Sequence, residues 1–159
     1  MKKYFSPILL FLFCLALVQS SFAASSIPKF QVVAQDKTVL AILVPKNTPA
    51  EQLKTLISEF RTARKNNTLS KMIPATTRGG QLGDYAIVWI FVFSKADWAT
   101  ADKLQKFINS SLKSAVDKQF GKEYVRHIQA EYFYSPLEEY GNLGYDDGIV
   151  RSPNYKKLF

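Results

Sequence analysis

The strongest chemical signal in the sequence is a cluster of cationic side chains between Lys37 and Arg78. This segment contains eight Lys and Arg residues but only two acids, Glu51 and Glu59. A cationic face attracts phosphate, sulfate and anionic headgroups through long-range forces that salt weakens. We therefore predict an anion-binding surface that consists of Lys54, Arg61, Arg64, Lys65, Lys71 and Arg78. The alternative is an ordinary solvated helix face on a cationic protein.

The surroundings of Arg78 form a second, smaller candidate for anion recognition. Arg78 is preceded by Thr76 and Thr77 and followed by Gly79 and Gly80. Glycines let backbone N–H groups converge on an anion, and an arginine adds a forked pair of donors. A glycine pair in a loop is also typical of a plain turn, so both interpretations stay open.

A polar row of side chains, His127, Gln129 and Glu131, occupies alternate positions of the last predicted strand. Such positions lie about 6–7 Å apart on one face of a strand, so all three side chains could reach one ligand. A histidine beside a carboxylate could act as a general base, and a hydrolase using His127 and Glu131 is one alternative function. A solvated sheet face produces the same pattern, and no activated nucleophile is identifiable. These two residues are therefore the only catalytic candidates.

The remaining composition excludes several classes of enzyme. The chain has 159 residues, a net charge of +8, one histidine and one cysteine, Cys14. A single histidine cannot build a multi-histidine metal site. The sequence also lacks a Walker A loop and the G-x-S-x-G, G-x-G-x-x-G, H-E-x-x-H and EF-hand motifs. We therefore expect no cofactor and no metal, and we favour binding over catalysis.

The C-terminal part of the sequence is acidic and rich in tyrosine. Residues 131–147 carry five acids and no base. The tyrosines of this part are Tyr132, Tyr134, Tyr140, Tyr145 and Tyr155. Tyrosine offers a large contact area at a low entropic cost, so an exposed aromatic surface would suit a secreted interaction or inhibitor protein. The other interpretation is that these rings pack the tail onto the sheet.

The N-terminus has the order of a secretory signal. Lys2 and Lys3 precede an apolar run over residues 8–18, and Ser21 and Ala23 supply the small residues of a cleavage site. The apolar run is too short to span a bilayer, which needs about 20 residues. We expect cleavage after Ala23 and export to the periplasm or the medium, as for a secreted bacterial effector. Because Cys14 would be removed, the mature chain would contain no cysteine.

Hydrophobic periodicity predicts the elements that position these side chains. Residues 29–44 alternate as a hairpin, and the second strand of this hairpin is apolar on both faces and therefore central. A capping box at residues 48–51 opens a helix with one apolar stripe that ends at Asn66 and Asn67. Residues 84–93 form the most hydrophobic run of the mature chain and predict a buried strand.

A second long helix is expected from Ser94 or Asp97 to a point near Gln119, followed by a last strand over residues 124–134. The predicted class is α/β, with α+β as the alternative. It consists of a small mixed four-stranded sheet of order ββαβαβ, with two long helices on one face or one on each. Residues 1–23 form the signal peptide, 24–134 a single domain and 135–159 an irregular, acidic, tyrosine-rich tail.

These observations together predict a small basic binding protein that recognises an anionic partner. That partner would be a polyanion, a phospholipid headgroup or an acidic protein surface. No sequence motif supports nucleic acid as the ligand. With no transmembrane segment expected in the mature chain, contact with an anionic membrane would be peripheral.

Overall fold

The structure, a computed structural model, describes residues 26–73, 87–110 and 114–159. The predicted signal peptide over residues 1–23 lies outside this part of the chain, as does the segment 76–80 with Arg78. Within the described ranges, no helix has the length and apolarity needed to cross a membrane.

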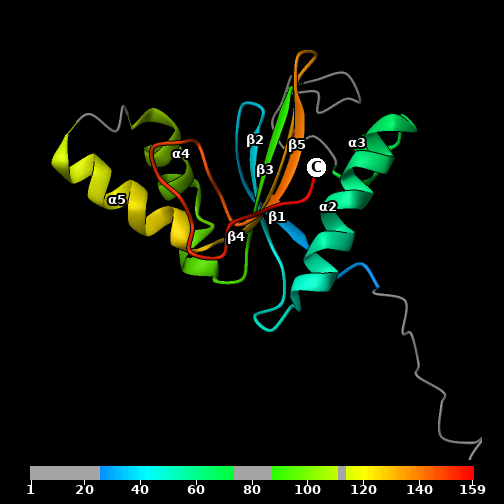
Figure 1. The fold of residues 1–159 in the computed structure, drawn as a ribbon, viewed down its shortest axis with the longest axis horizontal. Helices are drawn as coiled ribbons and strands as arrows, with labels where there is room; N and C mark the ends of the chain where they lie inside the picture. Colours follow the sequence, from blue (N-terminus) through cyan, green and yellow to red (C-terminus); the bar gives the residue numbers. More distant parts are fainter. Residues whose placement is uncertain (1–25, 74–86, 111–113) are drawn as a thin grey trace, which may run out of the picture.

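A single six-stranded mixed sheet forms the centre of the molecule (Figure 1). Its strands are β1 (Gln31–Asp36), β2 (Val39–Leu43), β3 (Val88–Phe93), β4 (Ile128–Tyr134), β5 (Glu139–Leu143) and β6 (Lys156–Lys157). They lie side by side in chain order, and only the β2–β3 pair is parallel. The parallel pair is central because both strands are almost entirely buried, as their continuous apolar sequences predict.

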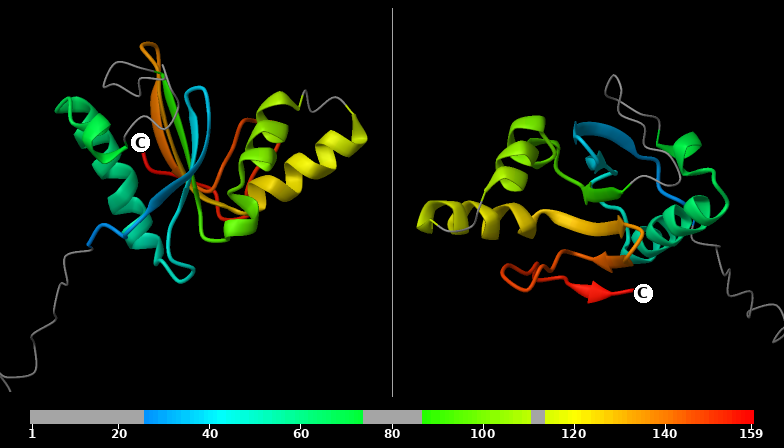
Figure 2. Two further views of the ribbon diagram at one scale, coloured as in Figure 1. Left: turned by 180° about the vertical axis from the view of Figure 1, so that it is seen from behind. Right: turned by 90° about the horizontal axis from the view of Figure 1, so that it is seen from above.

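Helices cover both faces of this sheet, so the fold has three layers (Figures 1 and 2). The helices are α2 (Ala50–Lys65), α3 (Leu69–Met72), the 3-10 turn η2 (Ala96–Trp98), α4 (Ala101–Asn109) and α5 (Ala115–Arg126). The α2–α3 pair packs on one face over an apolar core, and the α4–α5 pair packs on the other face over a second core. The predicted α/β class is confirmed, with the helices divided between the faces.

Helix α2 is the element that the sequence predicts most closely. Its apolar stripe is buried against the sheet, and its C-cap is Asn66, followed by Asn67 in the left-handed region with a φ of 54°. The N-cap is Pro49, and no side chain caps the first turn. Thr48, the expected cap, instead donates its hydroxyl to the carbonyl oxygen of Pro45 at 2.7 Å. The predicted capping box at residues 48–51 therefore does not form, although the helix begins within two residues of the expected position and ends at the expected asparagines.

The predicted second helix is wrong in its extent. Two helices replace it, and the second of these continues through Gly121 to Arg126, so that β4 begins at Ile128 rather than at residue 124. Ser114 starts the new helix by accepting a hydrogen bond from the backbone N–H of Asp117. Tyr124, the expected first residue of the strand, lies on α5 and is buried in the core beneath α4. A short apolar stretch of sequence is compatible with a helix as well as with a strand.

The predicted four-stranded sheet with an irregular tail is also corrected, because residues 139–157 supply two more strands. Strand β5 pairs with β4 through a turn in which Ser135 and Glu138 exchange backbone hydrogen bonds. Its sequence contains Gly141 and polar residues, which hide the usual strand pattern. The loop over residues 144–155 then folds back on the sheet, and Tyr145 and Val150 become part of the core.

Gly141 permits the close approach of α2 to β5. A Cβ atom at this position would lie 2.4 Å from Cγ2 of Ile57 and 2.6 Å from the ring of Phe159. We predict that Gly141→Ala lowers the free energy of unfolding by about 1–3 kcal/mol, because the buried backbone and ring must move. Urea denaturation measures this change.

The matched control is a double-mutant cycle with Ile57→Ala, which removes one of the clashing atoms. We expect the double variant to be more stable than the sum of the two single losses implies. Strict additivity would show that the glycine is not required by this contact.

Candidate functional site

The cationic residues of α2 lie along one stripe of the helix. Lys54, Arg61 and Lys65 follow the spacing i, i+7, i+11, which returns to the same helix face. Lys65 is exposed, as is Lys71 on α3, and neither side chain forms an ion pair with another described residue. Lys54 is partly buried and pairs with Glu51 one turn earlier. Five of the six predicted cations are thus on α2 and α3, and Arg78 lies outside the described residues.

Two arginines of α2, Arg61 on this stripe and Arg64 beside it, converge on the carboxylate of Glu139 on β5. Arg61 Nε lies 3.1 Å from Glu139 Oε2, and Arg64 Nε lies 3.0 Å from Oε1. The guanidinium groups also stack on aromatic rings, Arg61 at 4.1 Å from the centroid of Phe159 and Arg64 at 4.0 Å from that of Tyr134. Two positive charges face one negative charge, so the cluster keeps one positive charge in excess.

The surroundings of Glu139 favour its charged form. Burial raises the pKa of Glu139, but hydrogen bonds from Tyr132, Arg64 and Arg61 outweigh burial, and the resulting pKa is lowered. The Tyr132 hydroxyl donates to Oε1 at 2.9 Å. The two arginines therefore hold the end of β5 against α2 throughout the neutral pH range.

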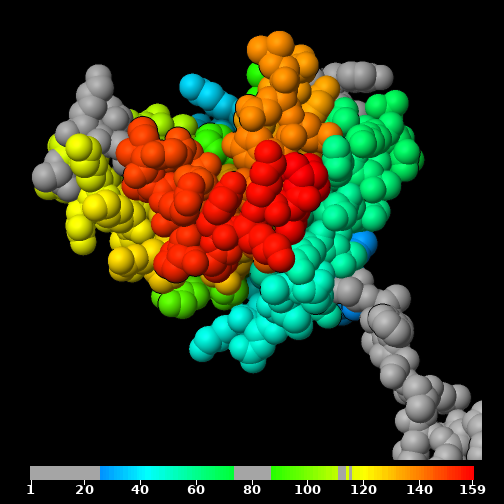
Figure 3. All heavy atoms as spheres, in the orientation of Figure 1, coloured from blue at the N-terminus to red at the C-terminus, as the bar shows by residue number. Residues whose placement is uncertain are grey.

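One further cation, which the sequence does not link to α2, lies on this face. Lys156 on β6 is exposed and is paired with Leu143 on β5, whose side chain belongs to the core beneath α2. Directly paired residues point to the same face of a sheet, so Lys156 lies on the α2 side. Figure 3 shows the C-terminal residues beside the helix. Only the strand register reveals this neighbour.

The expected polar row on the last strand does not form. His127 follows α5 with helical backbone angles, and its ring stacks on Trp98 with centroids 4.1 Å apart. Its Nε2 lies 3.2 Å from Glu123 Oε1. Burial lowers the pKa of His127, the hydrogen bond with Glu123 opposes this effect, and Lys95 lowers the pKa further. The histidine is therefore part of the α5 end rather than of a strand face.

Glu131, the other catalytic candidate, is completely buried. Its Oε2 accepts a hydrogen bond from Trp89 Nε1 at 3.0 Å, and its Oε1 accepts one from Asn142 Nδ2 at 2.8 Å. Burial raises the pKa of Glu131 to about 7, although these bonds and the backbone N–H of Asp146 lower it. Among the described residues, no hydrogen bond joins Glu131 to His127, so the structure does not bring the two candidates together.

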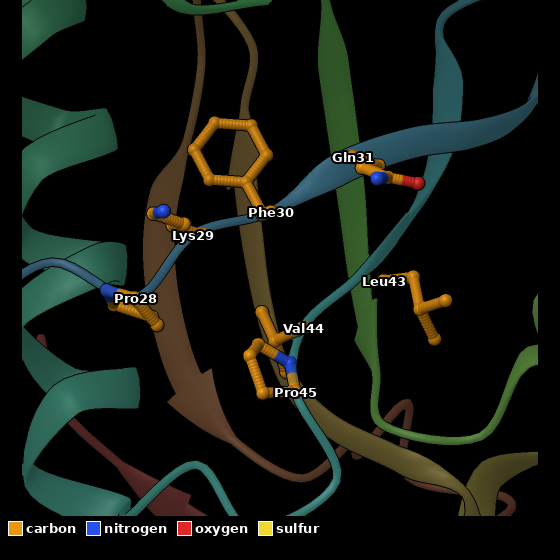
Figure 4. A pocket seen from close by; sticks show the side chains of 7 residues that line it. All are labelled: Pro28, Lys29, Phe30, Gln31, Leu43, Val44 and Pro45. Carbon is orange, nitrogen blue, oxygen red and sulfur yellow. The ribbon is translucent and has the colours of Figure 1, made fainter.

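A hollow at the edge of the sheet contains neither of the two catalytic candidates. This hollow, of about 550 Å³, lies where β1 begins and β2 ends, and its lining is mostly apolar (Figure 4). Its residues are Pro28, Lys29, Phe30, Gln31, Leu43, Val44 and Pro45. It contains no acidic side chain and no Ser, Thr, Cys or His. Across the described ranges, no three His, Cys, Asp or Glu side chains are placed to hold a metal ion.

The C-terminal tyrosines contribute more to packing than to an exposed surface. Tyr132 and Tyr145 are buried, and Tyr134, Tyr140 and Tyr155 are half-buried. Tyr140 stacks on Phe133 with ring centroids 5.0 Å apart. These rings attach the last two strands and the loop to the sheet, as one of the two sequence interpretations proposes.

Comparison of the chain with protein-family models, with curated proteins and with solved structures gave no match. Function is therefore inferred from the side chains themselves.

The buried Glu131 makes stability depend on pH. Its pKa is about 7 in the folded protein against 4.5 for an ordinary glutamate, so the folded state binds the proton more tightly. The group stabilises the fold most at low pH, and this stabilisation is lost as pH rises from about 4.5 to 7. We predict that Glu131→Gln, which mimics the protonated side chain, raises the free energy of unfolding at pH 8 by up to about 3 kcal/mol.

Urea denaturation at pH 8 and at pH 4.5 measures this difference. The variant and the parent should be nearly equally stable at pH 4.5, where Glu131 is neutral in the folded protein and about half-ionised in the unfolded chain. Glu138→Gln, at an exposed position nearby, is the matched control and should change little. A Glu131→Gln protein that loses the same stability at both pH values would contradict the assignment.

Proposed function

We propose that this chain is an exported basic protein that binds an anionic partner through the α2–α3 face. The observation that supports the proposal best is the excess positive charge where Arg61 and Arg64 meet Glu139. Arg61 keeps 38% of its side-chain surface exposed, so part of this side chain is accessible to a ligand. Exposed Lys65 lies one turn further along the same stripe.

The spacing of this stripe suits a linear partner with repeated negative charges. Lys54, Arg61 and Lys65 extend over eleven residue steps of helix, which corresponds to about 16 Å. A single small anion could bridge Arg61 and Lys65, which are one turn apart, but it could not also reach Lys54. A sulfated or phosphorylated polymer, an anionic lipid surface or an acidic protein surface would contact several at once.

The aromatic contacts of the arginines support binding at a fixed geometry. Phe159 and Tyr134 hold the two guanidinium groups in place before a partner arrives. Preorganised cations lose less conformational freedom on binding than free side chains do. The α2 face is therefore better suited to recognition than an array of mobile lysines.

Export and a periplasmic or extracellular location are part of the same proposal, and they rest on the signal-like order of residues 1–23. Binding is favoured over hydrolysis because His127 and Glu131 make separate sets of contacts. An inhibitor that used exposed tyrosines would need more of these rings at the surface than the structure shows.

The test uses Lys65→Gln/Lys71→Gln, because these two side chains are exposed and neither forms an ion pair with another described residue. Arg61 and Arg64 are left intact because they also support Glu139. We predict that the double variant elutes from immobilised heparin at lower salt. The slope of log K against log salt should fall by about one for each lost charge, as counterion release requires.

The matched control is Lys118→Gln/Lys122→Gln, which removes the same charge from exposed positions of α5 on the other face of the sheet. Binding to vesicles that contain phosphatidylserine is measured in parallel with heparin, which identifies the kind of anion. Equal losses in the two double variants would show that net charge alone drives retention, and the proposed face would be refuted.

A further inference from the structure

Glu139 is the only acidic side chain that pairs with the two arginines of α2 in the described part of the chain. Arg61 and Arg64 each form one ion pair, and both pairs are with this carboxylate. Glu139 is thus an anion of the chain itself, held within the face that we propose for an anionic partner. An oxyanion of the partner and this carboxylate need the same donors.

The two oxygen atoms of the Glu139 carboxylate are not held equally. Oε1 accepts hydrogen bonds from Arg64 Nε at 3.0 Å and from the Tyr132 hydroxyl at 2.9 Å. Oε2 accepts one from Arg61 Nε at 3.1 Å, and no other described side chain donates to it. Glu139 therefore stays attached to Arg64 and Tyr132 when Arg61 turns to another acceptor.

Arg61 is also the more accessible of the two arginines. It keeps 38% of its side-chain surface exposed, against 17% for Arg64. Its Nε donates to Glu139, and its two η nitrogens have no hydrogen-bond acceptor among the described residues. The buried polar side-chain atoms without a partner are the Tyr124 hydroxyl and Asn142 Oδ1. The η nitrogens of Arg61 do not belong to this group, so they reach solvent.

The η nitrogens of Arg61 form a fork that suits an oxyanion. Their N–H groups lie in the plane of the guanidinium and match two oxygens of a phosphate, sulfate or carboxylate. The centroid of the Phe159 ring lies 4.1 Å from Arg61 Cζ, so the ring covers one face of the group and leaves the fork at its edge. Lys65 follows one turn later on the same stripe. A linear polyanion can therefore contact Arg61 and Lys65 with successive oxyanions.

We propose that Glu139 is an internal competitor of a linear polyanionic partner, and that the two compete for Arg61. An oxyanion of the partner binds the η nitrogens of Arg61, and Glu139 lowers its affinity because two negative charges then share one guanidinium. Arg64 and Tyr132 keep Glu139 in place. The contact is autoinhibitory, since it holds β5 against α2 and at the same time limits binding. This inference rests on the proposed function, because it concerns the same face.

The competition is local and only partly screened by salt. The Glu139 carboxylate and the bound oxyanion would be separated by little more than one guanidinium group, which is less than the Debye length of about 8 Å at physiological ionic strength. Lys65 and Lys71 form no ion pair with an acid in the described ranges, so their attraction for the partner carries no such penalty. The partner is thus attracted by the lysines and opposed at Arg61.

The test compares Glu139→Gln with Glu138→Gln. Both variants remove one negative charge from neighbouring positions, but Glu138 is exposed and forms no ion pair with another described residue. We expect Glu139→Gln to bind heparin about three- to tenfold more tightly at fixed salt. Glu138→Gln should change the affinity by less than about twofold. Equal gains in the two variants, or a loss in Glu139→Gln, would overturn the proposal.

Vesicles that contain phosphatidylserine serve as a second probe in the same comparison. Heparin carries its oxyanions along one chain, as the spacing of the stripe favours, whereas a bilayer presents them as a plane. A gain of Glu139→Gln on heparin supports the linear polyanion. A gain that appears with vesicles and not with heparin would overturn it in favour of a lipid surface.

A double-mutant cycle with Arg61→Gln separates competition for Arg61 from the removal of charge elsewhere on the face. In the Arg61→Gln background, Glu139→Gln has no Arg61 to release, so its gain in heparin affinity should fall to that of Glu138→Gln. An undiminished gain would show that Glu139 acts on the face as a whole, and competition for Arg61 would be refuted.

A second pair of variants leaves Glu139 in place, because Glu139→Gln also removes the partner of Arg64 and circular dichroism must show that it folds. Arg61→Lys keeps the charge but loses the fork, and it should weaken heparin binding about three- to tenfold. Arg126→Lys on α5, at an exposed arginine that also pairs with a glutamate one turn away, is the matched control and should not change binding. Equal binding of these two variants would refute the site at Arg61 even if Glu139→Gln does not fold.

These outcomes are distinct from a failure of the proposed function. Lys65→Gln/Lys71→Gln may lower heparin binding while Glu139→Gln and Glu138→Gln behave alike, in which case the α2–α3 face binds anions and the internal competition is refuted. If the lysine variant instead matches its control on α5, the face itself is refuted, and this inference falls with it.

Discussion

The buried carboxylate of Glu131 is the contact on which the C-terminal part of the fold depends. It lies on β4 and accepts hydrogen bonds from Trp89 of β3 and Asn142 of β5. The backbone N–H of Asp146 brings the loop over residues 144–155 to the same group. A carboxylate is costly to bury unless donors surround it, so these donors cannot leave it independently. Three strands and the loop are thereby held as one unit around a single side chain.

Strand β5 contributes side chains to both faces of the sheet, because successive side chains of a strand point to opposite faces. Glu139 and Leu143 point toward α2, where Glu139 meets the two arginines. Tyr140 and Asn142 point to the opposite face, where they line an acidic hollow. Gly141 lets the strand approach Ile57 closely enough for these contacts to form. One five-residue strand therefore contacts both the two arginines of α2 and the buried Glu131.

The sequence predicts local elements well and long-range partners poorly. The stripe and ends of α2 follow from spacing and turn residues, and the cations on it are readable as one face. The partner of Arg61 and Arg64 is not predictable, because Glu139 lies more than seventy residues away and reaches them only through the pairing of β5. Strand β5 itself is missed because glycine and polar residues interrupt its pattern. The buried state of Glu131 depends on the same unpredicted strand and loop.

The pKa values of the two carboxyl groups on opposite faces, Glu139 and Glu131, are shifted in opposite directions. The arginines and Tyr132 lower the pKa of Glu139, so the α2 face keeps its charge balance across the neutral range. Burial raises the pKa of Glu131 to about 7, so the charge of this group on the other side of the sheet changes within that range. A change of pH near neutrality would therefore alter one face and leave the other as it was. Because the sheet lies between them, the charge on each face is set by a different carboxyl group.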